Sequence, residues 1–214
     1  ASASTSAAAA ASALLARCRS LAAVKQLHAH FLTHSNGPFP YNHFLSKLLS
    51  LSSATVAVTN AASDYALLLL SYHPAPTAFS YNVALRLFAS SRPGTTLRLF
   101  LRMLRAGLRP DAYTLPFLLL AAARSPSPPV ARSAHALLDK LGLRDHDHTV
   151  HSLITMYSYL GDHLAARRVF DGIPRRDVVS WNSMIKAYER AGMVAEVEGM
   201  FRSMVAEGTV APNG

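Results

Sequence analysis

The sequence predicts an all-α protein, an α-solenoid in which helix-turn-helix pairs repeat along the chain. Three observations support this fold class. An apolar helical pattern recurs at spacings between 31 and 35, a second amphipathic segment follows each copy, and glycine or proline stands at the corners. One helical pair buries its apolar face poorly alone, but stacked pairs share a continuous core.

The first helix of each repeat is predicted from apolar residues at positions i, i+3, i+4 and i+7, which lie on one helical face. The four clear copies of this stripe are Tyr81, Ala84, Leu85 and Phe88; Leu115, Leu118, Leu119 and Ala122; Val150, Leu153, Ile154 and Tyr157; and Trp181, Met184, Ile185 and Tyr188. Successive copies follow at spacings of 34, 35 and 31. A weaker copy at Leu45, Leu48 and Leu49 precedes the first of them at a spacing of 36.

The second helix of each repeat is predicted from amphipathic segments that share one large residue. This residue is Phe100, His135, Phe170 or Phe201, at spacings of 35, 35 and 31. The corners within the pairs are "RPG" at 92–94, "SPSPP" at 125–129, "LGD" at 160–162 and "AGM" at 191–193. The second segments are followed by Gly107, Gly142, Gly172 and Gly208, where a left-handed C-cap favours glycine.

The composition narrows the classes of partner. The 214-residue chain has a formal net charge of +9 and a pI near 10.1, which makes nucleic acid or an anionic surface the first partner to consider. The single cysteine, Cys18, excludes an intramolecular disulfide framework and a cysteine-rich zinc site. The apolar stretches at 65–72 and 115–123 are about half as long as a membrane-spanning helix, so no membrane partner is expected.

Histidines gather at 28–30 and 146–151, and imidazole is a common metal ligand. No cysteine or carboxylate spacing completes a tetrahedral set around them, so we expect neither a metal nor a cofactor. His135 is expected to pack as the phenylalanines at its position do.

Residues 1–11 are rich in alanine and serine, and the chain has no acidic residue before Asp64. This composition is typical of a transit-peptide remnant, and a disordered leader is an equal alternative. Residues 12–77 are expected to form degenerate repeats ahead of the clear repeats in 78–213.

Two families of helical repeat share a period of about 34 residues. The tetratricopeptide repeat carries a glycine in its first helix, but Ile154 and Ile185 stand at that place here. The segments "AFSYNVALRLF" (78–88) and "VVSWNSMIKAY" (178–188), with repeat ends such as "GLRPD" (107–111), resemble pentatricopeptide repeats instead.

The successive repeat lengths of 34, 35, 31 and 36 resemble the alternating P, L and S units of the plant PLS class. On this resemblance the units are P (78–111), L (112–146), S (147–177) and P (178–213), after degenerate L-like and S-like units in 12–77. The resemblance implies a right-handed superhelix that binds single-stranded RNA in a chloroplast or mitochondrion.

In this family, one residue of the first helix and the last residue of the same repeat select one base together. The resemblance therefore implies that Asn82 with Asp111 reads a uridine and that Asn182 with Asn213 reads a pyrimidine. An amide offers both a donor and an acceptor, which suits the edge of a base.

The remaining candidate residues have supporting roles. The resemblance implies that Phe79 and Val179 pack against bases and that His151 and Asp177 make weaker base contacts. Lys186 and Arg190, on the first helix of the last repeat, are candidates for phosphate contacts, which supply much of the affinity for nucleic acid.

The chain is predicted to be a non-enzymatic adaptor for organellar RNA processing. PLS proteins resemble editing factors, many of which end in a cytidine-deaminase-like domain, but the H-x-E and P-C-x-x-C motifs of zinc deaminases are absent here. C-to-U RNA editing is the first expected role, with editing-complex proteins as partners and any deaminase in further C-terminal sequence or in a partner. The alternative is a tetratricopeptide-like scaffold that binds a peptide in its concave groove.

Overall fold

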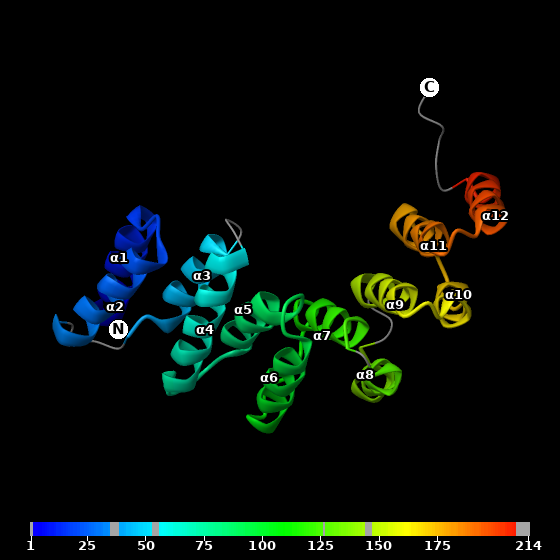
Figure 1. Ribbon diagram of the computed structural model, residues 1–214. Helices are drawn as coiled ribbons and strands as arrows, with labels where there is room; N and C mark the ends of the chain where they lie inside the picture. Colours follow the sequence, from blue (N-terminus) through cyan, green and yellow to red (C-terminus); the bar gives the residue numbers. More distant parts are fainter. Residues whose placement is uncertain (1, 35–38, 53–55, 126, 144–146, 209–214) are drawn as a thin grey trace. The chain divides into compact units, whose positions relative to one another are not determined.

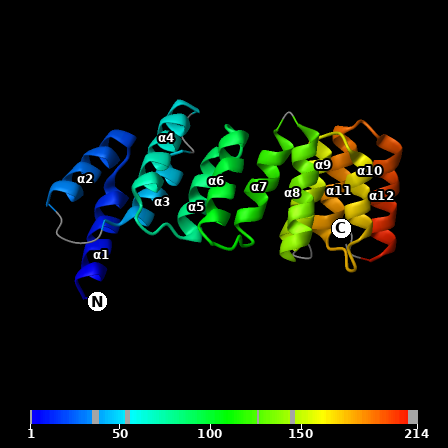
Figure 2. The ribbon, with the colours of Figure 1, turned by 90° about the horizontal axis from the view of Figure 1, so that it is seen from below.

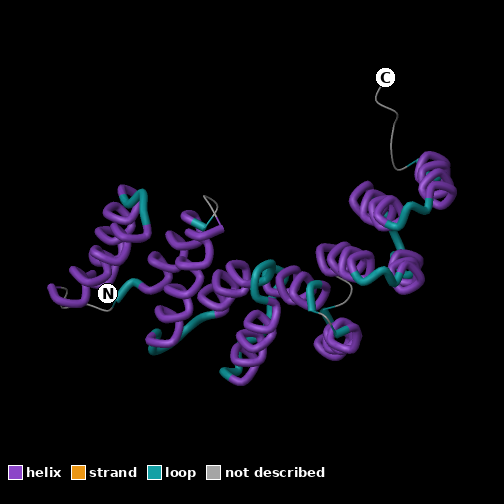
Figure 3. Tube along the Cα trace, viewed as in Figure 1, coloured by secondary structure: helices purple, strands orange, loops and turns teal. Residues whose placement is uncertain are grey.

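The computed structural model describes residues 2–34, 39–52, 56–125, 127–143 and 147–208, and it confirms an all-α helical-repeat solenoid (Figure 1). These ranges hold twelve α-helices and no strand (Figure 3). Contacts divide the chain into two compact units, Ala1–Pro110 and Asp111–Gly214, which are described separately. None of the described helices is long and apolar enough to cross a membrane.

Each unit contains three helical hairpins. The helices of the first unit are α1 (Ser2–Arg17), α2 (Leu21–His34), α3 (Tyr41–Leu51), α4 (Val56–Tyr72), α5 (Ala78–Phe88) and α6 (Pro93–Arg105). The helices of the second unit are α7 (Thr114–Ala123), α8 (Pro128–Leu141), α9 (Asp147–Tyr159), α10 (His163–Asp171), α11 (Val178–Arg190) and α12 (Val194–Ala206).

The first helices of successive hairpins pack on one another in both units (Figure 2). In the second unit, α7 packs on α9 and α9 on α11, whereas the described parts of α8, α10 and α12 make no close backbone contact with each other. Each second helix packs on its own first helix, and α8 and α10 also reach the next one. Within each unit the first helices therefore form a tight row, and we call these helices the inner row.

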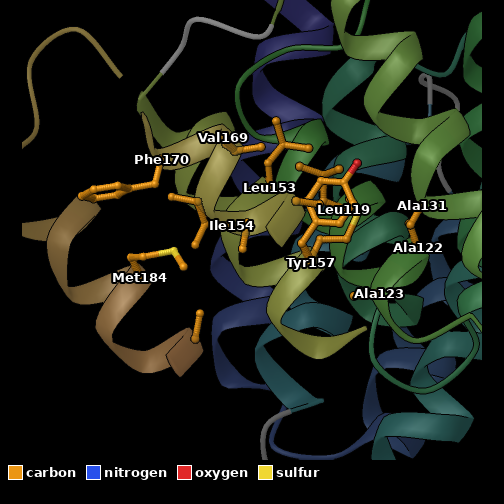
Figure 4. Packing of buried hydrophobic residues seen from close by; sticks show 14 of the residues in the cluster. Leu119, Ala122, Ala123, Ala131, Leu153, Ile154, Tyr157, Val169, Phe170 and Met184 are labelled. Carbon is orange, nitrogen blue, oxygen red and sulfur yellow. The ribbon is translucent and has the colours of Figure 1, made fainter. Parts of the chain in front are cut away.

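The predicted stripes form the core between the first and second helices. In the second unit a continuous cluster runs from Leu119 through Ile154 and Tyr157 to Phe170 and Met184 (Figure 4). Burying a side chain of this size stabilises the fold by about 1.5–3 kcal/mol relative to leaving it exposed, before entropy is counted.

The stripe of α3 is placed differently from the sequence prediction. Phe44, Leu45 and Leu48 are fully buried, whereas Leu49 is only half-buried, so the fully buried face includes Phe44, and the four-point pattern that contains these three residues starts at Tyr41, which is half-buried, and not at Leu45. The stripe thus begins one helical turn earlier than predicted, which lengthens its spacing from the stripe of α5. The longer spacing accommodates α4, which has 17 residues where α6 has 13.

The glycine prediction holds at three of its four positions. Gly107, Gly142 and Gly208 have φ between 65° and 72°, the left-handed region that glycine enters without a steric penalty. Gly172 was expected to do the same, and this is wrong, because its φ is −76° and its amide donates to Arg168 O as in a continuing helical turn.

The residue expected to pack in each second helix is buried at Phe100 and Phe170, but Phe201 is 60% exposed. The Phe170 ring packs edge-on against Trp181 of α11, with centroids 5.0 Å apart. Among the described residues no helix follows α12, so nothing covers Phe201 in the same way. His135 packs edge-on against Tyr157 and hydrogen-bonds its hydroxyl at 2.8 Å.

Helix α1 crosses the predicted boundary between residues 11 and 12. Ala11 and Leu15 are buried, and α1 packs on α3. The assignment of residues 1–11 to a leader stays a prediction.

Candidate nucleic-acid interface

The inner row presents one residue per repeat at the place where a base-selecting side chain is predicted. We call this the reader position, which directly follows the first residue of each stripe. It is occupied by Asn42 in α3, Asn82 in α5, Pro116 in α7, His151 in α9 and Asn182 in α11. Sequence reasoning missed Asn42, because the stripe of α3 was placed one helical turn too late.

A buried hydroxyl stands two residues before the reader position in four of these helices. Ser80, Thr114, Thr149 and Ser180 are all at most 2% exposed. Their spacings are 34, 35 and 31, and each directly precedes a stripe, so the sequence carried a signal that was overlooked. Since buried polar side chains are normally hydrogen-bonded, each of these hydroxyls needs a partner.

At the start of α5, Ser80 connects two repeats. Its Oγ accepts the backbone N–H of Thr77 at 3.1 Å and donates to Oδ1 of Asn42 on α3 at 2.8 Å. Thr77 is the N-cap, and its Oγ1 accepts the Ser80 N–H at 3.4 Å and lies 3.2 Å from Ser80 Oγ. The side chain of Asn42 is thereby held toward α5.

Asn42 lines a groove of about 520 Å³ between α1, α3 and the start of α5. The groove walls include Lys47 and Phe79, a basic group and an aromatic ring that is 49% exposed. Phe79, predicted to pack against a base, is therefore available on the surface beside Asn42.

At the start of α11, Ser180 makes the equivalent connection to α9. Its backbone N–H and its Oγ donate to Oδ1 of Asp177 at 2.7 and 2.6 Å, and Nε2 of His151 lies 3.0 Å from Oγ. Nε2 of His151 is also 3.3 Å from Asp177 Oδ1. The two residues predicted to make weaker base contacts are thus joined through one serine.

Desolvation by burial would raise the pKa of Asp177, but the hydrogen bonds from Ser180 and the nearby His151 outweigh it and lower the pKa. Asp177 is therefore held as a carboxylate that caps α11. His151 lines a second groove, of about 250 Å³, between α7 and α9, together with Pro116 and Tyr159.

The start of α7 repeats the aspartate arrangement. Oδ1 of Asp111 accepts from the backbone N–H and the Oγ1 of Thr114, both at 2.9 Å. Asp111 is half-buried and so is Asn82, which belongs to the other unit. The joint reading of one base by Asn82 and Asp111 stays a prediction.

The start of α9 is the exception. Oγ1 of Thr149 is buried and has no hydrogen-bond partner among the described residues. The reader position of the preceding repeat is Pro116, whose side chain can neither donate nor accept a hydrogen bond. Among the described residues, the hydroxyl therefore has no partner in the repeat that follows a reader position without a hydrogen-bonding side chain.

Asn182, Val179 and Lys186 are exposed on α11, with Val179 at 53%. Asn213 lies outside the described residues, so its pairing with Asn182 stays a prediction.

Arg190, predicted to contact phosphate, packs on an aromatic ring. Its guanidinium lies 3.9 Å from the centroid of the Tyr159 ring and donates to the Tyr159 hydroxyl at 3.1 Å. This hydrogen bond and the charges of Arg190 and Arg124 lower the pKa of Tyr159. Tyr159 and Arg190 are the last residues of α9 and α11, and Arg124 is the C-cap residue of α7. The three follow one another at spacings of 35 and 31, and sequence reasoning missed the first two.

Comparison with known proteins agrees with this architecture. A model of the PPR repeat matches residues 179–209. Over 178 residues, the chain is 39% identical to the pentatricopeptide repeat-containing protein OGR1, mitochondrial, of Oryza sativa subsp. japonica, covering 80% of this chain and 29% of that protein. It is 32% identical over 193 residues to the pentatricopeptide repeat-containing protein At2g02980, chloroplastic, of Arabidopsis thaliana, covering 89% and 31%.

The crystal structure of the pentatricopeptide repeat protein PPR10 from maize has the same fold, with a TM-score of 0.64 at 18% identity. That match covers 95% of this chain and 34% of PPR10. PPR10 has also been crystallised in complex with an 18-nt psaJ RNA element. The chain spans about a third or less of the length of these relatives.

Proposed function

This chain belongs to the family of pentatricopeptide repeat proteins, and from that premise we propose that its inner row binds single-stranded RNA with sequence selectivity. The observation that carries the proposal is the row of reader positions, in which Asn42 and His151 line grooves and are each oriented by the following repeat. One oriented polar side chain per repeat suits the reading of successive bases.

The proposed base contacts extend to the other reader positions. Asn82 with Asp111 would read a uridine, and Asn182 with Asn213 a pyrimidine, by resemblance to the family. Phe79 and Val179 are exposed and suitable for packing against the flat faces of bases.

Phosphate contacts are proposed for Lys186 and Arg190, to which Arg124 is now added. Arg124 and Arg190 flank Tyr159, so two positive charges gather at the ends of neighbouring first helices. Such a cluster suits an anion, and the net charge of +9 favours RNA association in general.

A more specific cellular role is proposed by resemblance to the same family. Relatives named chloroplastic and mitochondrial support an organellar location, and the alternating repeat lengths support the PLS class and a role in C-to-U RNA editing. The described segment would then act as the adaptor that selects the RNA, with editing-complex proteins as its partners.

The test is binding of a labelled pool of random single-stranded RNA to the chain, measured by fluorescence anisotropy over a range of salt concentrations. RNA binding should weaken with a log-log slope of about 0.7 per neutralised phosphate. Arg190→Ala should reduce the slope by about 0.7, because one phosphate contact is lost. The control is Arg202→Ala on α12, where Arg202 pairs with Glu198 and no RNA contact is proposed.

A salt-insensitive interaction with a peptide, and no RNA binding at low salt, would favour the tetratricopeptide-like scaffold instead. Equal slopes for Arg190→Ala and the unmodified chain would remove Arg190 from the proposed phosphate contacts.

A further inference from the structure

We propose that the exposed face of α6 is a docking surface for an acidic amphipathic helix of a protein partner. α6 is the second helix of its hairpin and packs on α5, so it is not part of the inner row (Figure 1). The surface therefore serves a partner other than the RNA. It consists of a row of arginines with a row of leucines beside it.

The net charge of the chain is carried entirely by its first unit. Residues 1–110 contain ten basic residues and one acidic residue, Asp64, whereas residues 111–214 contain eleven of each kind. Asp64 pairs with Arg92. The first unit has no other side-chain carboxylate to compensate its remaining cations, and this favours an anionic partner.

Three of these cations form a row along α6. Arg98, Arg102 and Arg105 are exposed and stand at i, i+4 and i+7, so they lie on one helical face and span about 10 Å. Arg98 donates to the hydroxyl of Thr95 at 3.0 Å, which is a neutral group, and none of the three forms an ion pair with a described residue. Like charges at these spacings repel one another and weaken a helix, so a row of carboxylates on a partner would relieve the repulsion.

A row of leucines runs beside the arginines. Leu97, Leu101 and Leu104 have the same spacing and each comes one residue earlier. Leu101 is 47% exposed, and the other two are half-buried. The core is filled by another face of α6, which includes Phe100 and Met103. The leucine row therefore leaves apolar surface next to three positive charges.

The equivalent surface of α10 and α12 is built differently. The large aromatic residue of each second helix aligns these two helices with α6. At the places of Leu97 and Leu101, they have the pairs Arg167 with Asp171 and Glu198 with Arg202. Both are i, i+4 ion pairs, at 2.9 and 3.0 Å, which are ordinary on a solvated helix surface. On α6 leucines replace the ion pair, and the arginines beside them are uncompensated.

The two rows together favour one kind of anionic partner. Phosphate groups of RNA or of lipids would use the arginines but leave the leucines without a contact. Carboxylates at i, i+4 and i+7 of a partner helix have the same rise as the arginines, and an apolar row beside them can pack on the leucines. Insertion into a membrane requires a broad apolar face, and the broad apolar face of α6 is buried in the core.

The test uses a fluorescein-labelled synthetic helical peptide with glutamates at i, i+4 and i+7 and leucines in the adjacent row. Its binding to the full chain is measured by fluorescence anisotropy, with a scrambled peptide of the same composition as the control probe. The amphipathic peptide should bind about tenfold more tightly than the scrambled one, because only the ordered pattern meets both rows of α6.

Variants of the chain locate the binding on α6. Arg102→Glu with Arg105→Glu should weaken binding of the amphipathic peptide by about tenfold or more, because like charges then face each other. The matched control, Arg132→Glu with Lys140→Glu, makes the same charge change on the exposed surface of α8 and should weaken it by less than about threefold. Circular dichroism checks that both double variants are folded.

The leucine row is tested without a change of charge. Leu101→Gln alters an exposed side chain, so the fold should persist, and it should weaken binding of the amphipathic peptide about fivefold through the lost apolar contact. It should leave binding of the scrambled peptide unchanged.

Other outcomes overturn the proposal. If the amphipathic peptide does not bind, or binds no better than the scrambled one, α6 does not recognise an acidic amphipathic helix. Equal losses in the two double variants would show only a general attraction by the net charge. A loss of binding to RNA or to phosphatidylserine vesicles that is specific to the α6 double variant, with peptide binding retained, would assign the arginines to phosphate groups.

This proposal and the proposed binding of RNA fail separately. RNA binding should fall to the same extent in the α6 and α8 double variants, since both lose the same positive charge away from the inner row. A chain that binds the amphipathic peptide but no RNA would keep the docking surface and remove the RNA-binding function.

Discussion

The α3/α5 joint and the α9/α11 joint share one contact but differ in charge. In both, a buried serine in the first turn of the later helix lies 2.8 or 3.0 Å from the reader side chain of the earlier one. The cap residue is the neutral Thr77 in one case and the carboxylate Asp177 in the other. Repeats of one fold can thus keep the same contact between successive first helices, while a single cap residue changes the charge beside that contact.

An aromatic contact between α10 and α11 lies next to the α9/α11 joint, and we call it the aromatic seam. Phe170 of α10 packs on Trp181 of α11, and Arg176 lies over both rings at 4.9 and 6.0 Å from their centroids. At the equivalent place in the last hairpin, Phe201 is mostly exposed. Among the described helices, Phe170 is thus covered by the following first helix α11, and Phe201 has no such cover.

The largest expected effect comes from breaking this aromatic seam. Phe170→Ala should lower the free energy of unfolding by about 3–5 kcal/mol, because it leaves a cavity against Trp181. Urea unfolding followed by the fluorescence of Trp181, the only tryptophan, measures this at the joint itself. The matched variant Phe201→Ala should change stability by less than about 1 kcal/mol. Similar losses for the two variants would show that Phe201 is covered in solution.

A smaller effect should distinguish the two N-cap residues, Asp177 and Thr77, because only the contribution of Asp177 to the free energy of unfolding should depend on pH. Asp177→Ala should cost about 1–2 kcal/mol near pH 7, because α11 loses its N-cap. The folded pKa of Asp177 is lowered, so its contribution is present above about pH 4 and is lost as the pH falls through the folded pKa. Urea unfolding of the variant and the unmodified chain should therefore converge in acid.

Thr77→Ala is the neutral counterpart of that change. It should cost about 1 kcal/mol, and the difference should stay the same in acid because the Thr77 hydroxyl does not titrate in this range. A far-UV circular dichroism signal followed in urea at pH 7 and in acid measures it. A pH-dependent loss at Thr77 would contradict the assigned difference between the joints.

The smallest expected effects come from the buried threonines, and they have opposite signs. Thr149→Val should be neutral or stabilise the fold by up to about 1 kcal/mol, since its hydroxyl has no described partner to lose. Thr114→Val should destabilise by about 1 kcal/mol, because Asp111 loses a donor. Thermal unfolding of the two variants compares them directly, and a loss at Thr149 as large as that at Thr114 would indicate a partner for its hydroxyl.

Most of the fold could be predicted because its signals are local. The stripes ending at Phe88, Tyr157 and Tyr188 repeat with helical periodicity, and the glycines at Gly107 and Gly142 follow from the geometry of helix ends. The shift in α3 could not be predicted, because the apolar residues around Leu45 fit two registers one turn apart. The burial that distinguishes them comes from packing of α3 against α1, α2, α4 and α5, which no local pattern shows.

The sequence by itself determined which side chains stand at the reader positions of the clear repeats, since a fixed offset from each stripe identifies them. Only the tertiary structure decided which hydrogen-bond donors and acceptors of those side chains are engaged by the following repeat. Asn42 and Ser80 are 38 residues apart, and His151 and Ser180 are 29 apart, so no local pattern shows that they meet. Their hydrogen bonds form only when two hairpins stack, because the direction of a hydroxyl proton depends on every acceptor around it in space.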